Sequence, residues 1–341
     1  GQAYIDNSII EEWAQKDPIS HFEMFLLKSK YLSKKEMDAI NASTSKEIDQ
    51  NWSSANSYKE VDFNIENELG DVYKEHIEGK SDPKDESLRE VRLVDSIKDG
   101  INESMEQHDN LVIMGQDIAE YGGVFKVTDG LFDKYGKNRV LNTPLCESVI
   151  LSSAYGLSVG GYKSIVEMQF ADFVSSGFTA LVNLIAKSNY RWSQNSDVVV
   201  RMPCGGGVGA GPFHSQTNEV WFTKVPGLKV VYPSHPYEAK GLLNASIDDP
   251  NPVMYFEHKF LYRTVSEEIP SSRYTLELGK GKIRNIGSKV TIVSYGLGVH
   301  WALDLLDNYK NQEIEIIDLN TLVPWDKELV FNSIKKTGKV L

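Results

Sequence analysis

His214 follows an unusually glycine-rich stretch of the chain. The segment RMPCGGGVGAGPFHSQ (201–216) places five glycines within seven residues, then a proline, an aromatic residue and His214. The strand-like run DVVVRM precedes it, and ligands of open α/β sheets bind at the carboxyl ends of strands. A flexible surface loop would explain the same composition. The functional alternative is that bare backbone lets a ligand approach closely and places His214 beside that ligand.

Two phosphate-binding motifs match this stretch poorly. Gly205, Gly207 and Ala210 fit G-x-G-x-x-G/A loosely, but Pro212 follows instead of a helix, and no acidic residue stands at a ribose-binding spacing. The stretch is not a Walker A loop either, because no G-K-[ST] follows the glycine run. A dinucleotide-binding protein therefore stays an alternative that protection by NAD would support.

Glu147 is the candidate carboxylate. In NRVLNTPLCESVILSSAYG, which begins at 138, a short strand leads through Pro144 into a helix whose first turn holds Glu147. An acid there complements the helix dipole, which is a purely structural explanation. Its neighbours Leu145 and Val149 are apolar, and a carboxylate among apolar groups can share a proton near neutral pH and act as an acid or base.

Aromatic residues form the third candidate group. The run VEMQFADFVSSGF (166–178) contains Phe170, Phe173 and Phe178 after an apolar strand. Core packing explains them most simply. An aromatic ring at the end of a strand can also stack on a flat cofactor ring.

Alternating strands and helices would position these candidates. After residue 88, β-rich runs begin at 111, 164, 197, 228 and 252, with helical patterns near 91–107, 148–160, 174–189 and 236–247. Continuous apolar strands separated by helices predict an α/β fold with a parallel sheet covered on both faces. A second βαβα pattern begins near 285. The chain ends at GKVL, which resembles the opening of another strand, so we expect a fragment.

The first 75 residues are predicted to be helical and to carry no chemistry. Asp17-Pro18 is a helix start, and Ser33 with Glu36 forms a capping box. The polar stretch GKSDPKDES (79–87) predicts a linker or a boundary.

Composition excludes several classes of protein. The 341 residues carry a net charge of −12, and residues 1–90 hold 20 acidic and 11 basic residues. A nucleic-acid binder would need a basic face, so we expect no nucleic-acid partner. No apolar run approaches the roughly 18 residues of a membrane span, and the amino terminus lacks the pattern of a signal peptide. Cys146 and Cys204 are too few for a disulfide framework, and we expect a cytoplasmic protein.

The order of five motifs resembles a known enzyme family. From about Arg92 onward, the chain is similar to the β subunit of the thiamine-diphosphate-dependent decarboxylase component of 2-oxo acid dehydrogenase complexes, with the 2-oxoisovalerate type closest. The motifs are TPLCES, EMQFADF, GGGVGAGPFHSQT, PGLKVVYPSHPYEAKGLL and DPNPVMYFEHKFLYR.

The amino-terminal segment resembles the tail of the α subunit of the same enzymes. DPISHFEMFLL and LSKKEMDAI carry this likeness, with His21 where the family usually has arginine. An α tail that continues into a β chain implies a fused enzyme, of which this chain would be the second part.

The resemblance implies three regions. Residues 1–87 would be a helical α-subunit-like tail and linker. Residues 88–275 would be a transketolase-like pyrimidine-binding domain, whose parallel sheet is covered by helices. Residues 276–341 would be an incomplete transketolase C-terminal α/β domain.

The resemblance also implies roles for five residues in thiamine diphosphate binding and catalysis. Glu147 would hydrogen-bond the pyrimidine ring nitrogen and thereby favour the imino tautomer that generates the ylid. Phe173, where branched-chain relatives often have tyrosine, would stack on the pyrimidine, and Leu145 would help hold the bent cofactor. His214 would be the acid or base for acyl transfer, and Gln169 would line the same pocket.

The implied reaction is oxidative decarboxylation of 3-methyl-2-oxobutanoate, with acyl transfer to the lipoyl group of the acyltransferase component. The α side would supply the Mg²⁺ ligands, since the sequence has no G-D-G motif, and the assembly would be α2β2-like or a homodimer. A structural K⁺ ion is possible in the stretch with Asp249 and Asn251. Pyruvate as substrate, transketolase-like carbon transfer and a non-catalytic half stay open as alternatives.

Overall fold

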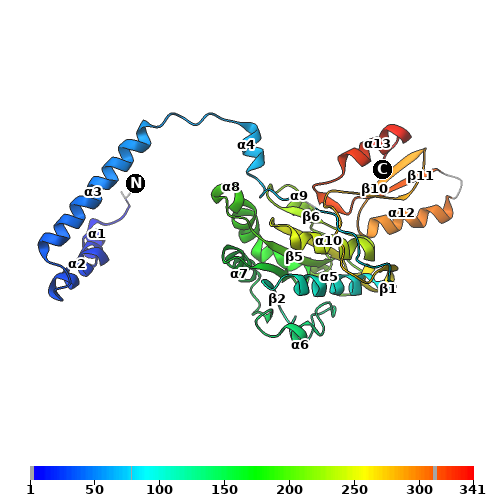
Figure 1. The fold of residues 1–341 in the computed structure, drawn as a ribbon, viewed down its shortest axis with the longest axis horizontal. Coiled ribbons are helices and arrows are strands. Elements are labelled where there is room, and N and C mark those ends of the chain that lie inside the picture. Colours follow the sequence, from blue (N-terminus) through cyan, green and yellow to red (C-terminus); the bar gives the residue numbers. More distant parts are fainter. Residues whose placement is uncertain (1–3, 78, 310–312) are drawn as a thin grey trace. The chain divides into compact units, whose positions relative to one another are not determined.

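A computed structural model describes residues 4–77, 79–309 and 313–341. Contacts divide the chain into two compact units between Asn64 and Ile65 (Figure 1). Each unit is therefore described by itself.

The first unit consists of helices, as predicted. Asp17 caps α2, because its Oδ2 accepts a hydrogen bond from Ser20 N at 2.8 Å. The predicted capping box of Ser33 and Glu36 is also present and starts α3. The bounds are α1 (Asn7–Ala14), α2 (Pro18–Lys28) and α3 (Lys34–Ser57).

A seven-stranded sheet is the centre of the second unit. Its strand order is β12-β6-β7-β5-β4-β2-β3, and all pairs are parallel except β12 with β6. The predicted parallel sheet is thus confirmed, with an added antiparallel edge strand. The bounds are β2 (Leu111–Gly115), β3 (Val140–Asn142), β4 (Lys163–Glu167), β5 (Val198–Cys204), β6 (Lys229–Val231), β7 (Val253–His258) and β12 (Thr321–Val323).

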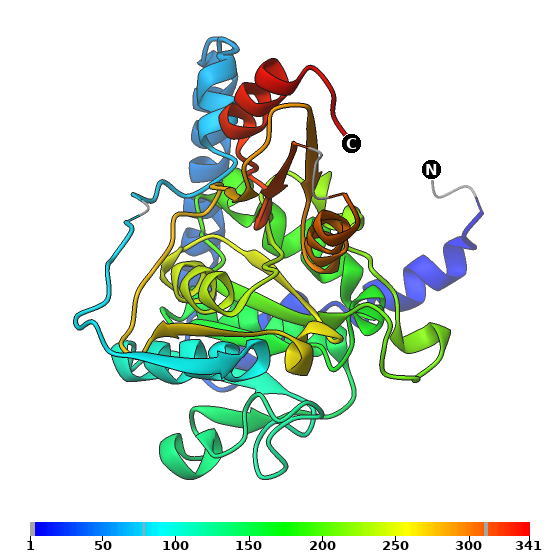
Figure 2. The ribbon, with the colours of Figure 1, turned by 90° about the vertical axis from the view of Figure 1, so that its right-hand side faces the viewer.

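Helices cover both faces of this sheet. Successive strand side chains point to opposite faces, so Leu111 and Ile113 belong to one hydrophobic cluster, while Val112 and Met114 belong to another. The first cluster packs against α5 (Leu93–Gln107) and α10 (Pro236–Asp248), which lie beside each other in Figure 2. The second packs against α7 (Glu147–Val159) and the segment 171–192. Burial on both faces explains the continuous apolar strands of the sequence.

The segment 171–192 is not the regular helix expected near 174–189. It contains η1 (Ala171–Gly177), the π-helical turn η2 (Ala180–Leu184), η3 (Ile185–Lys187) and α8 (Ser188–Trp192). Gly177 lies so close to α7 that a Cβ atom there would stand 2.3 Å from Leu151 Cδ1. The irregular turns accompany this close approach, which brings η1 against the first turn of α7.

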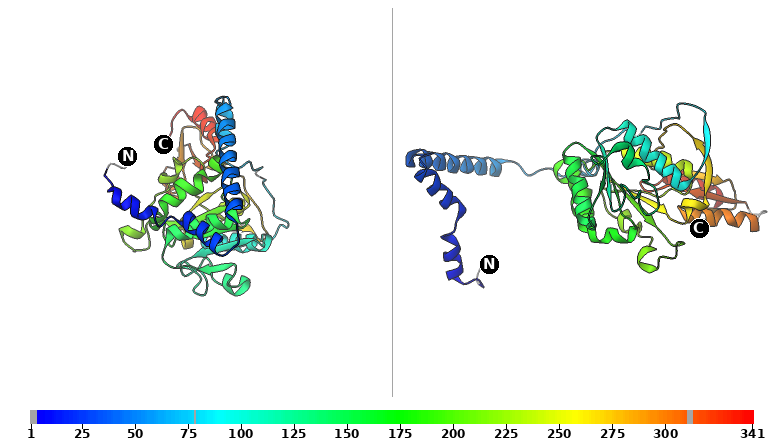
Figure 3. Two further views of the ribbon diagram at one scale, coloured as in Figure 1. Left: turned by 90° about the vertical axis from the view of Figure 1, so that its left-hand side faces the viewer. Right: turned by 90° about the horizontal axis from the view of Figure 1, so that it is seen from below.

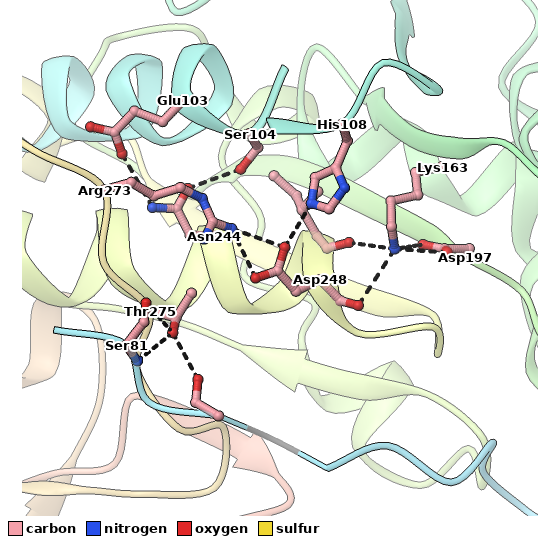
Figure 4. Close-up of polar contacts among 12 residues, drawn as sticks. Ser81, Glu103, Ser104, His108, Lys163, Asp197, Asn244, Asp248, Arg273 and Thr275 are labelled. Atoms are coloured by element: carbon pink, nitrogen blue, oxygen red, sulfur yellow. Dashed lines mark hydrogen bonds and ion pairs between the residues drawn. The ribbon is translucent and has the colours of Figure 1, made fainter. Parts of the chain in front are cut away.

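The segment predicted to be a linker is bound to the second unit. Ser81 N donates to Thr275 Oγ1 at 2.8 Å (Figure 4), and Lys74 N donates to Asn251 Oδ1 at 2.7 Å. Strand β1 (Leu88–Arg92) then pairs with β8 (Ser266–Pro270). The boundary expected at residue 87 therefore lies inside this unit.

The carboxyl-terminal residues form the predicted βαβα arrangement, coloured orange to red in Figure 3. A small sheet has the strand order β10-β11-β9. Strand β12, which follows β11 in the chain, does not belong to this sheet and pairs with β6 of the large sheet. The bounds are β9 (Lys282–Asn285), β10 (Val290–Ser294), α12 (Leu297–Asn308), β11 (Ile314–Asp318) and α13 (Lys327–Thr337).

Among the helices of the described residues, none has the length and apolar character that crossing a bilayer requires.

Two histidines at the start of α10 and α12 predict sensitivity to acid. The rings of His235 and His300 stack with centroids 4.6 Å apart. Burial, and then the charge of Arg284, lower the pKa of His235 to about 2. The unfolded chain therefore takes up a proton at this residue below about pH 6.5, and the folded chain does not. Stability that is present at pH 7 is consequently lost as the pH falls.

We expect His235→Gln to flatten the decline of stability between pH 6.5 and 5 by on the order of 1 kcal/mol per pH unit. Unfolding free energies from urea titrations at several pH values would measure this. The exposed His21 provides the control His21→Gln, which should leave the slope unchanged. Parallel slopes for His235→Gln and the parent chain would contradict the assignment.

Candidate functional site

The candidate residues gather where parallel strands end. Residues that follow β2, β3, β4, β5 and β7 meet at this edge, because parallel strands present their carboxyl ends on one side of a sheet. In chain order they are Gln116, Glu147, Gln169, Phe173, His214 and Lys259. The two that are most distant in the sequence, Gln116 and Lys259, are 143 residues apart.

Glu147 is held by polar contacts at the start of α7. Gln116 Nε2 donates to its Oε1 at 3.2 Å, and Ser176 Oγ lies 2.9 Å from its Oε2. The apolar neighbours Leu145 and Val149 are 79% and 57% exposed, so they do not enclose the carboxylate within this chain. Gln116 and Ser176 therefore fix its orientation.

Gln116 and Ser176 were not candidates in the sequence. Gln116 directly follows the buried strand β2, and that position was the available signal. Ser176 lies in η1, whose contact with α7 depends on the close approach at Gly177, and the sequence pattern gave no signal for it.

An aromatic cluster surrounds the histidine. Phe170 and Phe173 both meet the ring of His214 edge-on, with centroid distances of 4.7 and 5.3 Å. Phe125 contacts Phe170 in the same manner at 5.7 Å. Since Ser176 Oγ also lies 3.0 Å from the carbonyl oxygen of Phe173, the cluster is continuous with the Glu147 contacts. The structure thus brings Glu147, Phe173 and His214 into one site.

The other two predicted residues lie at its margin. Gln169 Nε2 donates to Asp117 Oδ2 at 3.1 Å, one residue beyond Gln116, so Gln169 borders the site. Leu145 stands two residues before Glu147 and is exposed.

Backbone conformation and close packing require glycine at two positions of the loop before His214. Gly205 has φ +78°, and a Cβ atom there would overlap His258 Nε2 at 2.1 Å. Gly207 has φ +99°, and its Cβ would stand 2.9 Å from the Phe260 ring. Gly205 N donates to Gln216 O at 2.9 Å and closes the loop. The loop therefore packs its backbone directly against His258, the last residue of β7, and against Phe260 just after it.

We expect Gly207→Val to lower activity on the order of 100-fold while lowering the melting temperature by only a few degrees. A β-branched residue at positive φ, pressed against Phe260, would displace the loop that carries His214. Gly206→Ala is the matched control, because nothing lies within 4 Å of its added Cβ. Turnover and thermal unfolding of both variants would be measured. If the melting temperature of Gly207→Val falls by many degrees along with its activity, the substitution destabilises the whole fold, and the loss of activity says nothing specific about the loop.

A buried ionic cluster lies beneath the site. Arg201 of β5 is fully buried and donates to Glu257 from Nε and Nη2, both at 2.7 Å, and to Glu167 from Nη1 at 2.5 Å. Tyr262 Oη donates to Glu257 at 2.5 Å, and its ring lies 5.3 Å from that of Phe125. The cluster therefore supports the aromatic cluster from below.

Two buried polar atoms beside Glu147 indicate whether the site suits a cofactor. Among the described residues, no group hydrogen-bonds to Gln116 Oε1 or Thr143 Oγ1, although both atoms are buried. Buried polar atoms normally have partners, so a ligand with polar ring atoms suits this position. No group of three or more metal-ligating side chains is found in the described part of the chain.

Side-chain oxygens of the stretch expected to hold K⁺ accept hydrogen bonds from the chain itself. Asp249 Oδ2 accepts from Lys229 Nζ at 2.5 Å, and its Oδ1 accepts from Asn251 N at 2.8 Å. Asn251 Oδ1 accepts from Lys74 N. These contacts do not decide whether a cation binds nearby, and the K⁺ ion stays a prediction.

Comparisons with known proteins agree with this geometry. Residues 89–265 match the family "Transketolase, pyrimidine binding domain", residues 279–341 match "Transketolase, C-terminal domain", and residues 1–64 match "Dehydrogenase E1 component". A split-gene transketolase in an inactive β4 tetramer shares the fold, with a TM-score of 0.60 and 21% identity over 73% of this chain and 78% of that chain. The predicted transketolase-like fold is confirmed.

Curated relatives narrow the family. The 2-oxoisovalerate dehydrogenase subunit beta of Bacillus subtilis (strain 168) is 42% identical over 257 residues, which are 74% of this chain and 78% of the relative. The pyruvate dehydrogenase E1 component subunit beta of Acholeplasma laidlawii is 43% identical over 256 residues, with the same coverage. The chain therefore belongs to the oxidoreductase family of thiamine-diphosphate-dependent E1 components of 2-oxo acid dehydrogenase complexes, with a β-subunit-type region after an E1-type helical segment.

Proposed function

We propose that this chain takes part in the oxidative decarboxylation of a branched-chain 2-oxo acid, 3-methyl-2-oxobutanoate, with acyl transfer to the lipoyl group of an acyltransferase component. The observation that carries the proposal is the oriented carboxylate of Glu147, which Ser176 and Phe173 connect to His214 in its aromatic cluster. The likeness to a 2-oxoisovalerate dehydrogenase β subunit supports the substrate class.

Glu147 and Phe173 are proposed to hold the pyrimidine half of thiamine diphosphate. Glu147 would hydrogen-bond a ring nitrogen and share its proton, and the contacts from Gln116 and Ser176 would keep the carboxylate aimed at that atom. Phe173 would stack on the ring, with Gln169 and Leu145 at the edge of the site. When bound, thiamine diphosphate supplies a nucleophilic carbon for the keto group and a thiazolium ring that takes up the electron pair left when CO2 departs.

His214 is proposed to move a proton during reductive acyl transfer to the lipoyl disulfide, whose S–S bond breaks as one sulfur takes the acyl group. It is half-buried at the end of the glycine loop, with Phe170 and Phe173 on its flank. Histidine is the side chain that most often serves as a general acid or base in enzymes. The aromatic neighbours would keep water from the acyl group during transfer.

The remaining components lie outside this site. We propose that a partner domain supplies the Mg²⁺ ligands and that the active assembly is α2β2-like or a homodimer. We also propose the functional division 1–87, 88–275 and 276–341, and a cytoplasmic location, in which the free thiols of Cys146 and Cys204 would stay reduced.

Pyruvate is the second candidate substrate, because the relative from Acholeplasma laidlawii is named a pyruvate dehydrogenase subunit. Dye reduction by the assembled enzyme, with thiamine diphosphate and Mg²⁺, would compare 2-oxoisovalerate with pyruvate. Higher kcat/KM for the branched acid supports the proposal, and higher kcat/KM for pyruvate replaces its substrate. Cofactor binding without turnover of either acid would favour another thiamine reaction, such as transketolase-like carbon transfer. Failure to bind the cofactor in the assembly would favour a non-catalytic half.

A further inference from the structure

Lys259 is a buried lysine that contacts the backbone of His214. It directly follows β7 and is 3% exposed. Its Nζ donates to the carbonyl oxygen of His214 at 2.8 Å, across 45 residues of sequence. Lysine is rarely buried to this degree without a specific partner. The bond therefore calls for an explanation beyond packing.

The surroundings of this ammonium group belong to the site. Burial lowers the pKa of Lys259, and the negative charge of Asp172 opposes that shift. The Nζ atom lies 5.2 Å from the centroid of the Phe170 ring, whose edge-on contact with His214 is described above. None of the ion pairs of the described residues includes Lys259, so a backbone carbonyl and an aromatic ring are its close partners.

The loop that carries His214 needs such an anchor. Its five glycines allow wide backbone freedom, and a hydrogen bond at each end limits it only partly. Gly205 N donates to Gln216 O at 2.9 Å, and Gln216 N donates to Asp172 Oδ1 at 3.2 Å. Lys259 adds a third attachment, at His214 itself, from the end of a fully buried strand.

We propose that Lys259 is a positioning residue for His214 in acyl transfer to the lipoyl group. The ammonium group holds the carbonyl of His214, and Phe170 lies against both side chains, so the imidazole keeps one place relative to Glu147 and Phe173. This inference rests on the proposed role of His214. It adds a requirement for the acyl-transfer half of the reaction and none for the decarboxylation half.

The test compares the two half-reactions in the assembled enzyme. Dye reduction reports decarboxylation, and reductive acylation of a free lipoyl domain reports acyl transfer. We expect Lys259→Met to lower kcat for acylation about 10- to 100-fold, because small displacements of catalytic groups have effects of this size. Dye reduction should change by less than about 2-fold. Lys259→Arg keeps a charged donor and should recover most of the acylation.

Lys187→Met is the matched control. Lys187 Nζ also donates to a backbone carbonyl, that of Pro226, at 2.8 Å, but it lies away from the site. Both half-reactions should stay at the parent rate in this variant. The double variant His214→Ala/Lys259→Met should lose no more acylation than His214→Ala alone, since residues that act as a unit are not additive.

The outcomes separate the inference from the function on which it rests. If His214→Ala does not lower acylation selectively, the proposed role of His214 is wrong. If His214→Ala is selective but Lys259→Met lowers both half-reactions equally, or neither, the positioning role is wrong. If Lys259→Met does not fold, Lys259→Gln is measured in the same way, and the same selective loss is required.

Discussion

Replacing Glu147 by glutamine is expected to lower turnover of the assembled enzyme by about 10²- to 10⁴-fold. The amide has the shape of the carboxylate and keeps partners for Gln116 and Ser176, but it has no proton to share with a ring nitrogen. The loss should appear in kcat for both dye reduction and lipoyl acylation, because both need the activated cofactor. Steady-state kinetics at saturating thiamine diphosphate would measure it.

Stability provides the check on this variant. The melting temperature should stay close to that of the parent, since the carboxylate is only half-buried and its contacts survive in the amide. Glu106→Gln is the control, because Glu106 also accepts from an amide, Asn102 Nδ2 at 3.3 Å, on an exposed face of α5. Near-parent turnover of Glu147→Gln would remove Glu147 from the chemistry.

Replacing Arg201 by methionine is expected to lower the unfolding free energy by about 3–5 kcal/mol. Glu167 and Glu257 would then lie buried without their common cation. Burial already raises the pKa of Glu167, and the charge of Arg201 opposes this shift. Without Arg201 the folded-state pKa rises further, so the variant should recover part of its stability as the pH falls from 7 towards 5.

Urea titrations at these pH values would measure the effect of Arg201→Met. Arg191→Met is the control, because Arg191 is exposed over the Trp192 ring, and it should change stability by no more than about 0.5 kcal/mol. A companion variant that also carries Glu167→Gln and Glu257→Gln should regain much of the loss. A small loss that does not depend on pH would show that the cluster is more hydrated than its burial indicates.

The sequence pattern predicted the sheet well because its strands are buried on both faces. Strands β2, β5 and β7 appear as mainly apolar runs, and their order with the helices indicates parallel pairing. The order of the strands in the sheet could not be predicted, because the hydrophobic pattern does not say which strands are neighbours. The antiparallel strand β12 was missed for this reason.

The same limit applied to the site. Glu147, Phe173 and His214 stand in recognisable motifs at strand ends, and the structure brings them together. Gln116 and Lys259 reach their partners across 31 and 45 residues of sequence, through the pairing of strands that only the fold reveals. The segment 79–87 has the composition of a linker, and its hydrogen bonds to Ser272 and Thr275 come from backbone groups that composition does not describe.

Strand β12 has a consequence for the synthesis of this protein. It covers the outer edge of β6, and an uncovered strand edge is a template for pairing with another chain. Ribosomes add about 5–20 residues per second, so β6 emerges several seconds before Thr321–Val323 can reach it. During that interval the nascent chain presents an open β-edge, and at this stage it depends most on chaperones.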